Sequence, residues 1–232
     1  MATASEALIE ALTAIRPDAL CNFGPGGDKL VAESALLDRL LAEGCVEQQV
    51  RLWDQEPCLV TTRRIARLPG FQNACEKSGW PVVVRRSGGT TVLHRPGVVN
   101  VSLFLVGPDG GLKDGFDSLC GLILAATTQM GLALDAGSVS RSYCDGTHNI
   151  RWRGRKVAGT AALARRRGDW HGRLFHASIV ADGDAAADAA VIEAFEQAAG
   201  LAVRYDPNMH ISLAQAAAVS RSSFGLRPNL AL

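Results

Sequence analysis

The chain has 232 residues with 24 lysines and arginines, 23 aspartates and glutamates, and a formal net charge of +1. This length suits one full hydrophobic core, and a nearly neutral chain lacks the strong field that recruits nucleic acid or a membrane surface. No apolar run reaches the roughly eighteen residues of a membrane span, the start does not resemble a signal peptide, and the six cysteines form no C-x-x-C pair. We therefore expect a cytoplasmic protein with free thiols and no nucleic-acid or membrane partner.

The first third of the chain alternates helical and strand-like patterns. Apolar spacing predicts a helix over 4–15, peripheral to the core, and a flexible linker over 22–27. The following elements are, in order, a core-facing helix over 28–42 that ends at Gly44, two strands over 50–53 and 58–62 separated by a turn, and a short helix over 69–78 that Gly79 closes.

Residues 81–105 form the stretch around which the other elements are arranged. A buried strand over 82–84 runs into two arginines, breaks at a Ser-Gly-Gly turn, resumes over 90–93 and is followed by a second strand over 98–105. Adjacent glycines allow positive φ and let backbone N–H groups approach an anion. Because neighbouring strand residues point to opposite faces, only one of Arg85 and Arg86 should face this turn, where it could hold a carboxylate or phosphate.

The second half contains a long helix over 116–130, a strand over 139–143, a β-hairpin over 149–162, a strand over 172–180, two helices over 185–199 and 211–218, and a tail beyond 220. In the second hairpin strand, alternation places Lys156, Ala158 and Thr160 on one face. Small residues on both faces leave room for a ligand over this strand, and Lys156 is the side chain that would contact it.

Two strings in this order, RRSGGTTVLH over 85–94 and GRKVAGTA over 154–161, resemble the biotin/lipoate ligase catalytic domain. The resemblance is to the branch of lipoate-protein ligase A and the octanoyltransferases, whose pattern is R-R-x-[ST]-G-G-G-x-V-x-H followed by G-[RK]-K-[IV]-x-G-[ST]-A. It covers residues 28–220 and implies an α/β fold of the α+β type, with a mixed, largely antiparallel sheet and helices packed against it. Residues 1–27 would then be an N-terminal helix and linker, and residues 221–232 a tail.

The resemblance implies an enzyme that attaches lipoate or octanoate to a lysine of a lipoyl carrier domain of the 2-oxoacid dehydrogenase or glycine cleavage type. In the ligase form, ATP and Mg²⁺ would give an acyl-adenylate. Lys156 would contact the acyl carbonyl and the α-phosphate. The substrate and adenylate would be lined by Arg85, Arg86, Ser87, Gly88, Gly89, Thr90, His94, Asn149, Gly159 and Thr160.

Three departures from the family pattern leave alternatives open. Thr90 replaces the third glycine, Asn149 replaces an aspartate that would suit Mg²⁺, and a Gly-x-x-Gln element after the strand over 58–62 is missing. Cys144 lies twelve residues before Lys156 in a loop expected to be exposed, and it resembles a cysteine that carries the acyl group as a thioester in one octanoyltransferase branch. The resemblance therefore implies, as an alternative, an ATP-independent octanoyl or lipoyl transferase, with acyl carrier protein as a further donor. His148 and Lys156 would lower the pKa of this thiol. A domain that binds acyl or adenylate ligands without catalysis is a third hypothesis, and biotin is a less favoured substrate.

The histidines do not predict a metal site. His94, His171 and His176 show no i, i+2 or i, i+4 pairing, so we expect no metal held by protein histidines. His94 should instead brace the glycine turn through a backbone hydrogen bond.

Overall fold

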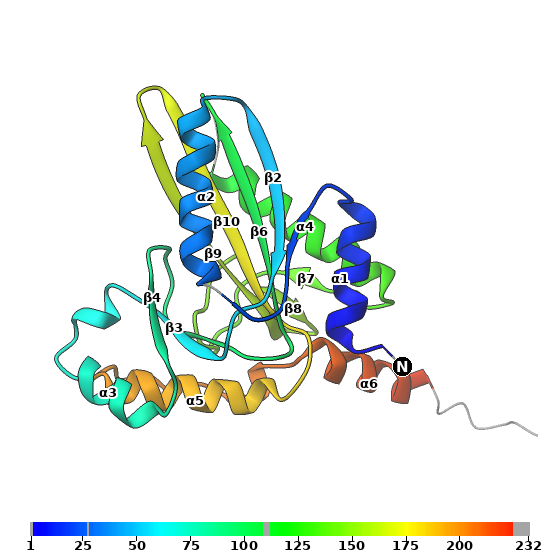
Figure 1. Cartoon of the computed structure of the whole chain (residues 1–232). Helices are drawn as coiled ribbons and strands as arrows, with labels where there is room; N and C mark the ends of the chain where they lie inside the picture. Colours follow the sequence, from blue (N-terminus) through cyan, green and yellow to red (C-terminus); the bar gives the residue numbers. More distant parts are fainter. Residues whose placement is uncertain (1, 27, 109–111, 225–232) are drawn as a thin grey trace, which may run out of the picture.

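The computed structural model describes residues 2–26, 28–108 and 112–224, and these form a large and a small β-sheet with helices around them (Figure 1). Within these residues the large sheet has seven strands, of which only the edge pair β1 and β2 is parallel. Its strands are, in spatial order, Leu20–Asn22 (β1), Glu47–Trp53 (β2), Val98–Gly107 (β6), Trp170–Val180 (β10), Arg155–Arg167 (β9), Ile150–Trp152 (β8) and Asp135–Ala136 (β7). This sheet confirms the predicted fold class.

Strand β6, the third in this order, is buried on both faces because helices cover both sides of the sheet. Its Val99, Val101 and Leu103 join one core cluster with α1 (Ala4–Ile15) and α4 (Leu112–Gln129). On the opposite face, β6 packs with α2 (Lys29–Glu43). The period of two along β6 thus assigns alternate residues to two cores.

The small sheet carries the Ser-Gly-Gly turn and has its own core. It contains, in spatial order, Val82–Arg85 (β4), Cys58–Thr62 (β3) and Val92–His94 (β5). The helices α3 (Phe71–Ser78) and α5 (Ala185–Ala198) pack against it. The strands expected over 50–53 and 58–62 therefore both form, but they belong to different sheets. The strand over 82–84 is an edge strand rather than a buried one, since 41% of Val84 is exposed.

The N-terminal helix α1 is part of the main core, so the expectation of a peripheral helix is wrong. Leu8 and Leu12 are completely buried, and the backbone N–H groups of Ala4 and Ser5 donate to the Asp182 carboxylate at 3.0 and 2.8 Å. Asn22, the first residue of the linker expected over 22–27, belongs to strand β1, which pairs with β2.

The C-terminal helix α6 (Leu213–Phe224) runs past the expected start of the tail, whose residues 225–232 lie outside the described part of the chain. Two short 3₁₀ turns, Ile65–Arg67 (η1) and Pro207–Met209 (η2), complete the elements. Among the described helices, none combines the length and the apolar character needed to cross a bilayer.

Gly115→Ala is expected to destabilise the protein, because α4 meets β10 at this glycine. An added Cβ would lie 2.1 Å from the ring of Phe175, which is completely buried. Overpacking of this kind costs about 1–3 kcal/mol. In the same helix, nothing lies within 4 Å of a Cβ added at Gly121, so Gly121→Ala should raise stability by about 0.5–1 kcal/mol. Urea unfolding of both variants checks the pair, and equal shifts would contradict the packing described here.

Candidate active site

The first of the two adjacent arginines at the end of strand β4 points into the interior, and the second points into solvent. Arg85 is 7% exposed and donates through Nη2 to the backbone oxygen of Thr90 at 3.0 Å, whereas Arg86 is exposed. Counted back from His94, Arg85 occupies the second arginine of the family pattern and Arg86 the unspecified position before the serine. Arg85 alone therefore faces the turn, whereas Arg86 is exposed and lines an open groove between α2 and β4.

The glycine turn packs against the sulfur of Cys144. Gly89 has φ +96°, and a Cβ added there would lie 2.6 Å from the Cys144 Sγ. The backbone N–H of Thr90 donates to this Sγ at 3.2 Å. The turn thus directs an N–H group at a potential anion, as its glycines predict, and the anion is the protein's own thiolate. Gly88 is exposed and has no close neighbour of this kind.

Gly89→Ala is expected to displace the Cys144 side chain. The added methyl group would overlap the sulfur, and an L-residue with φ near +96° is strained. We expect lower stability by about 1–3 kcal/mol and much slower alkylation of Cys144, followed by mass spectrometry. Gly88→Ala is the neighbouring control, because nothing lies within 4 Å of its added Cβ. Unchanged alkylation in Gly89→Ala would contradict this close approach.

Cys144 is buried, in contrast to the exposed loop position expected for it. It is 9% exposed and has φ +47°, and its loop contains a turn where a strand was expected over 139–143. The carboxylate of Asp145 holds the loop, because its Oδ1 accepts hydrogen bonds from Val139 N, Gly146 N and Asn149 Nδ2 at 2.7, 2.8 and 3.0 Å. Asn149 therefore acts on the shape of the Cys144 loop.

Lys156 lies beside the same loop. Its Nζ donates to the backbone oxygen of Cys144 at 2.8 Å and to that of Tyr143, and it lies 4.5 Å from the centre of the Tyr143 ring. A β-bulge explains its position: Arg151 pairs with Lys156 and Ile150 with Ala158, which leaves one extra residue in β9.

The bulge changes the face on which Lys156 lies. Its Nζ is 3.2 Å from a Cβ added at Gly159. Lys156 therefore shares a side with Gly159, and the strict alternation that grouped it with Thr160 is wrong.

The charges around Cys144 favour its thiolate. Burial raises the pKa of the Cys144 thiol, but Lys156, Arg85 and the hydrogen bond from the Thr90 N–H together bring this pKa below its ordinary value. Burial also lowers the pKa of Lys156, to about 8, against the opposing effect of Cys144. His148 contributes nothing here, since it stacks on Phe116 at 4.6 Å. The second cation is Arg85, not the histidine that was expected.

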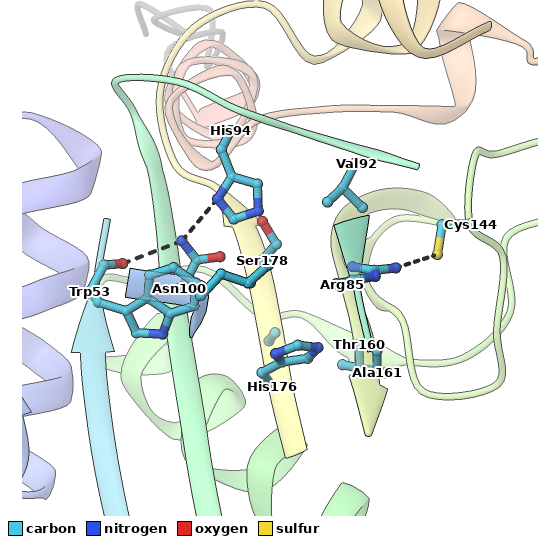
Figure 2. A pocket seen from close by; sticks show the side chains of 13 residues that line it. Trp53, Arg85, Val92, His94, Asn100, Cys144, Thr160, Ala161, His176 and Ser178 are labelled. Atoms are coloured by element: carbon cyan, nitrogen blue, oxygen red, sulfur yellow. Dashed lines mark hydrogen bonds between the residues drawn. The ribbon is translucent and has the colours of Figure 1, made fainter. Parts of the chain in front are cut away.

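A small interior cavity adjoins the thiol (Figure 2). Its volume of about 20 Å³ is enough for about one water molecule. Its walls come from both sheets and are formed by Leu30, Trp53, Arg85, Val92, His94, Asn100, Cys144, Gly159, Thr160, Ala161, His176, Ala177 and Ser178. An open groove of about 310 Å³ between α2 and β4 shares Leu30, Arg85 and His176 with it.

The sequence of this site matches a known family. Residues 27–205 fit the family model described as lipoyl protein ligase A/B catalytic domain. The chain belongs to this family. Octanoyl-[GcvH]:protein N-octanoyltransferase of Kyrpidia tusciae is 38% identical over 140 residues, which are 58% of this chain and 47% of the relative. Uncharacterized protein H16_B0148 of Cupriavidus necator is 33% identical over 209 residues, 82% of this chain and 81% of the relative.

The structural comparison agrees with the lipoyl ligase fold. Protein Ta0514 of T. acidophilum with bound lipoic acid superposes with a TM-score of 0.58 at 17% identity, over 90% of this chain and 95% of that one. At this identity the likeness shows the fold alone. The chain spans about half the length of the octanoyltransferases of K. tusciae and Geobacillus kaustophilus that it matches.

His94 and His176 each contact other side chains in the interior of the protein. His94 does not brace the glycine turn; it stacks on Trp53 at 6.0 Å and its Nδ1 lies 3.4 Å from Asn100 Nδ2 (Figure 2). His176 connects Ser87 Oγ, at 3.0 Å from Nε2, with Glu33 Oε2, at 3.2 Å from Nδ1. His94 and His176 both line the cavity. The described residues include no group of three His, Cys, Asp or Glu side chains placed to hold a metal ion.

The sequence analysis missed several residues that line the cavity or the adjoining groove, namely Trp53 and Asn100 in the cavity and Glu33 in the groove. Glu33 is 1% exposed in a helix that reads as an ordinary core-facing helix. A buried acid at a core position was the available signal, since such a group requires a partner. Trp53 and Asn100 gave no comparable signal. Each lies in a predicted strand, and packing in the core already explains the apolar pattern of that strand.

Proposed function

We propose that the chain is an ATP-independent transferase that moves an octanoyl or lipoyl group between carrier proteins, with Cys144 as the acyl-bearing nucleophile. The observation that supports it best is the position of two donors at the Cys144 sulfur, the Thr90 N–H at 3.2 Å and the Arg85 guanidinium at 3.8 Å. The ammonium of Lys156 donates to the backbone oxygen of Cys144. Cations and an N–H donor of this kind lower a thiol's pKa and activate it as a nucleophile.

The names of similar proteins support the same reaction. Matching relatives from K. tusciae and G. kaustophilus are octanoyl-[GcvH]:protein N-octanoyltransferases, and one from Listeria monocytogenes is a lipoyl-[GcvH]:protein N-lipoyltransferase. We therefore propose lipoyl carrier domains of the glycine cleavage type as partners, with those of 2-oxoacid dehydrogenases and acyl carrier protein as further candidates.

The proposed reaction has two steps at one sulfur. The Cys144 thiolate attacks the acyl carbonyl of the donor, the bond to the donor's lysine nitrogen breaks as that nitrogen takes up a proton from solvent, and an acyl-thioester forms on Cys144. The neutral amine of the acceptor lysine then attacks the thioester, its nitrogen loses its surplus proton to solvent, and the thiolate leaves. Arg85 and Lys156 supply positive charge near the oxygen that becomes negative in both steps, which is the usual source of stabilisation in acyl transfer.

The adenylate route fits the residues less well. The ammonium of Lys156, expected to contact an α-phosphate, already donates to the backbone oxygens of Tyr143 and Cys144. The nearby Asp145 Oδ1 accepts three hydrogen bonds from the loop itself. The proposed reaction therefore contains no step through ATP or Mg²⁺.

Acyl transfer without nucleotide tests the proposal. Incubation with an octanoylated carrier domain and an unmodified acceptor domain, in the absence of ATP, should give octanoylated acceptor and an octanoyl adduct on Cys144, both visible by mass spectrometry. Octanoate-dependent ATP–pyrophosphate exchange with Mg²⁺ is the opposing assay. Exchange without any Cys144 adduct would replace the transferase with a ligase, and tight octanoate binding without either reaction would indicate a binding domain.

A further inference from the structure

A chain of hydrogen bonds joins a serine, a histidine and an acid beside the glycine turn. His176 Nε2 lies 3.0 Å from Ser87 Oγ, and His176 Nδ1 lies 3.2 Å from Glu33 Oε2. Helix α2 supplies the acid, strand β10 the histidine and the loop after strand β4 the serine. All three side chains are buried, yet each lines the open groove between α2 and β4. The transferase reaction described above uses none of them.

A donor at the far end of this chain sets the direction of each hydrogen bond in it. The indole N–H of Trp53 can only donate, and it donates to Ser102 Oγ at 2.9 Å. Ser102 in turn donates its hydrogen to Glu33 Oε1. Because a carboxylate only accepts, His176 Nδ1 carries the proton shared with Glu33 Oε2. A neutral imidazole then has its lone pair on Nε2, so the Ser87 hydroxyl donates to it.

The backbone beside the serine is suited to binding an oxyanion. Gly88 and Gly89 follow Ser87 directly, and their N–H groups donate to no acceptor in the described part of the chain. Nothing in that part lies within 4 Å of a Cβ added at Gly88, so a ligand has room to approach the main chain there. The N–H of the residue after a nucleophilic serine is a usual donor to the oxyanion of acyl transfer.

The groove beside the serine is large enough for a substrate, in contrast to the cavity beside Cys144. Its volume is about 310 Å³, which reaches the range of about 300–1,000 Å³ that is common for ligand pockets. Its apolar wall would contact an acyl chain, and it is formed by Leu30, Val31, Val83, Val84, Leu163 and Leu174. Ser87 lines this groove and Cys144 lines the cavity, so the two groups face different spaces.

We propose that Ser87, His176 and Glu33 form a second catalytic site, which hydrolyses an ester or thioester of an apolar carboxylic acid. Ser87 Oγ attacks the acyl carbonyl while its proton moves to His176 Nε2. The same proton passes to the alcohol or thiol as the C–O or C–S bond breaks, leaving an ester on Ser87. Water then attacks this ester and gives a proton to His176 Nε2, and that proton returns to Ser87 Oγ as the carboxylic acid leaves. Glu33 is a positioning residue, which holds the imidazole in the required tautomer.

A fluorophosphonate probe tests the nucleophile in the unmodified protein, because such probes react with activated serines. Peptide mass spectrometry should locate the label on Ser87. Labelling should slow by about 10²-fold or more in His176→Asn, which removes the base. Glu33→Gln should slow it similarly, because the amide N–H₂ would face His176 Nδ1 and reverse the tautomer while the size of the side chain is kept. Labelling that is unchanged in both variants would overturn the triad.

Steady-state hydrolysis of p-nitrophenyl octanoate tests the turnover. The assay uses Cys144→Ala, in which no thiol at this position can react with the ester. Adding Ser87→Ala should lower hydrolysis by about 10³-fold or more. Adding Glu33→Gln instead should lower kcat by about 10²-fold or more with KM unchanged, a separation that a purely structural role of Glu33 would not produce.

The matched control is Ser142→Ala, which removes another buried serine hydroxyl. Within the described residues this hydroxyl has no hydrogen-bond partner, so both labelling and hydrolysis should stay unchanged. Hydrolysis that survives Ser87→Ala, a label on another residue, or the absence of both label and hydrolysis would overturn the inference. Neither assay depends on transfer between carriers, so the transferase proposal and this one can fail separately.

Discussion

Cys144→Ser is expected to reduce acyl transfer from an octanoylated carrier by about 10³-fold or more. A serine hydroxyl is a far weaker nucleophile than a thiolate, and the cations that lower the pKa of Cys144 cannot ionise an alcohol at neutral pH. The measurement is the rate at which acceptor domain gains the octanoyl group without ATP, with intact-mass analysis of the enzyme. The octanoyl adduct should disappear with the activity.

Cys120→Ser provides the matched control for this substitution. Cys120 is also buried, but its Sγ lies 3.6 Å from the His148 backbone oxygen, and burial raises the pKa of its thiol to about 11. Removing this unreactive sulfur should leave transfer unchanged. Full activity in Cys144→Ser would exclude the thioester mechanism, whatever the control does.

Lys156→Met is expected to give the second-largest loss, about 10²–10³-fold in transfer. Methionine fills similar space but carries no charge, so the thiolate and the oxyanion of each step lose a cation. Because a cation favours the thiolate, its removal raises the pKa of Cys144. The pH dependence of Cys144 alkylation should therefore move to higher pH, and an unmoved profile would contradict the role given to Lys156.

The pH dependence of acyl transfer by the unmodified protein should also depend on the charge of Lys156. The pKa of Lys156 lies near 8, so its charge is present below that pH and is lost above it. Acyl transfer should rise as Cys144 ionises and decline above about pH 8. In Lys156→Met this decline should be absent. The variant should also unfold more easily by about 1–3 kcal/mol for each buried carbonyl that it leaves without a partner, which urea titration measures.

Local patterns predicted most elements of this fold, because each depends on residues close in sequence. The hairpin of β8 and β9 turns at Arg153 and Gly154, whose φ values of +48° and +75° suit a two-residue turn. Asp28 caps the N-terminus of helix α2, its carboxylate accepting from Leu30 N and Val31 N, and Gly44 caps the C-terminus. The resemblance added Lys156 and the glycine turn as candidates, and their roles in catalysis stay predictions.

The errors concern features set by distant contacts. The burial of Cys144 depends on Thr90, 54 residues away, and alternation along β9 cannot reveal a single-residue bulge at Lys156. Arg85 and Arg86 look equivalent until β4 pairs with β3 and fixes which of them points inward. In each case the missing information is how a strand or loop meets its neighbour, within one sheet or between the two, which the spacing of apolar residues does not encode.

The interior cavity beside Cys144 has a thermodynamic consequence for substrate binding. A space of about 20 Å³ cannot enclose an eight-carbon chain, so if the proposed acyl group binds here, the walls must separate before the chain enters. The apparent affinity then equals the intrinsic affinity multiplied by the fraction of molecules already open. Because the walls come from two sheets with separate cores, a substitution that weakens the contact between the sheets would lower the stability of the empty protein and tighten its hold on the acyl chain.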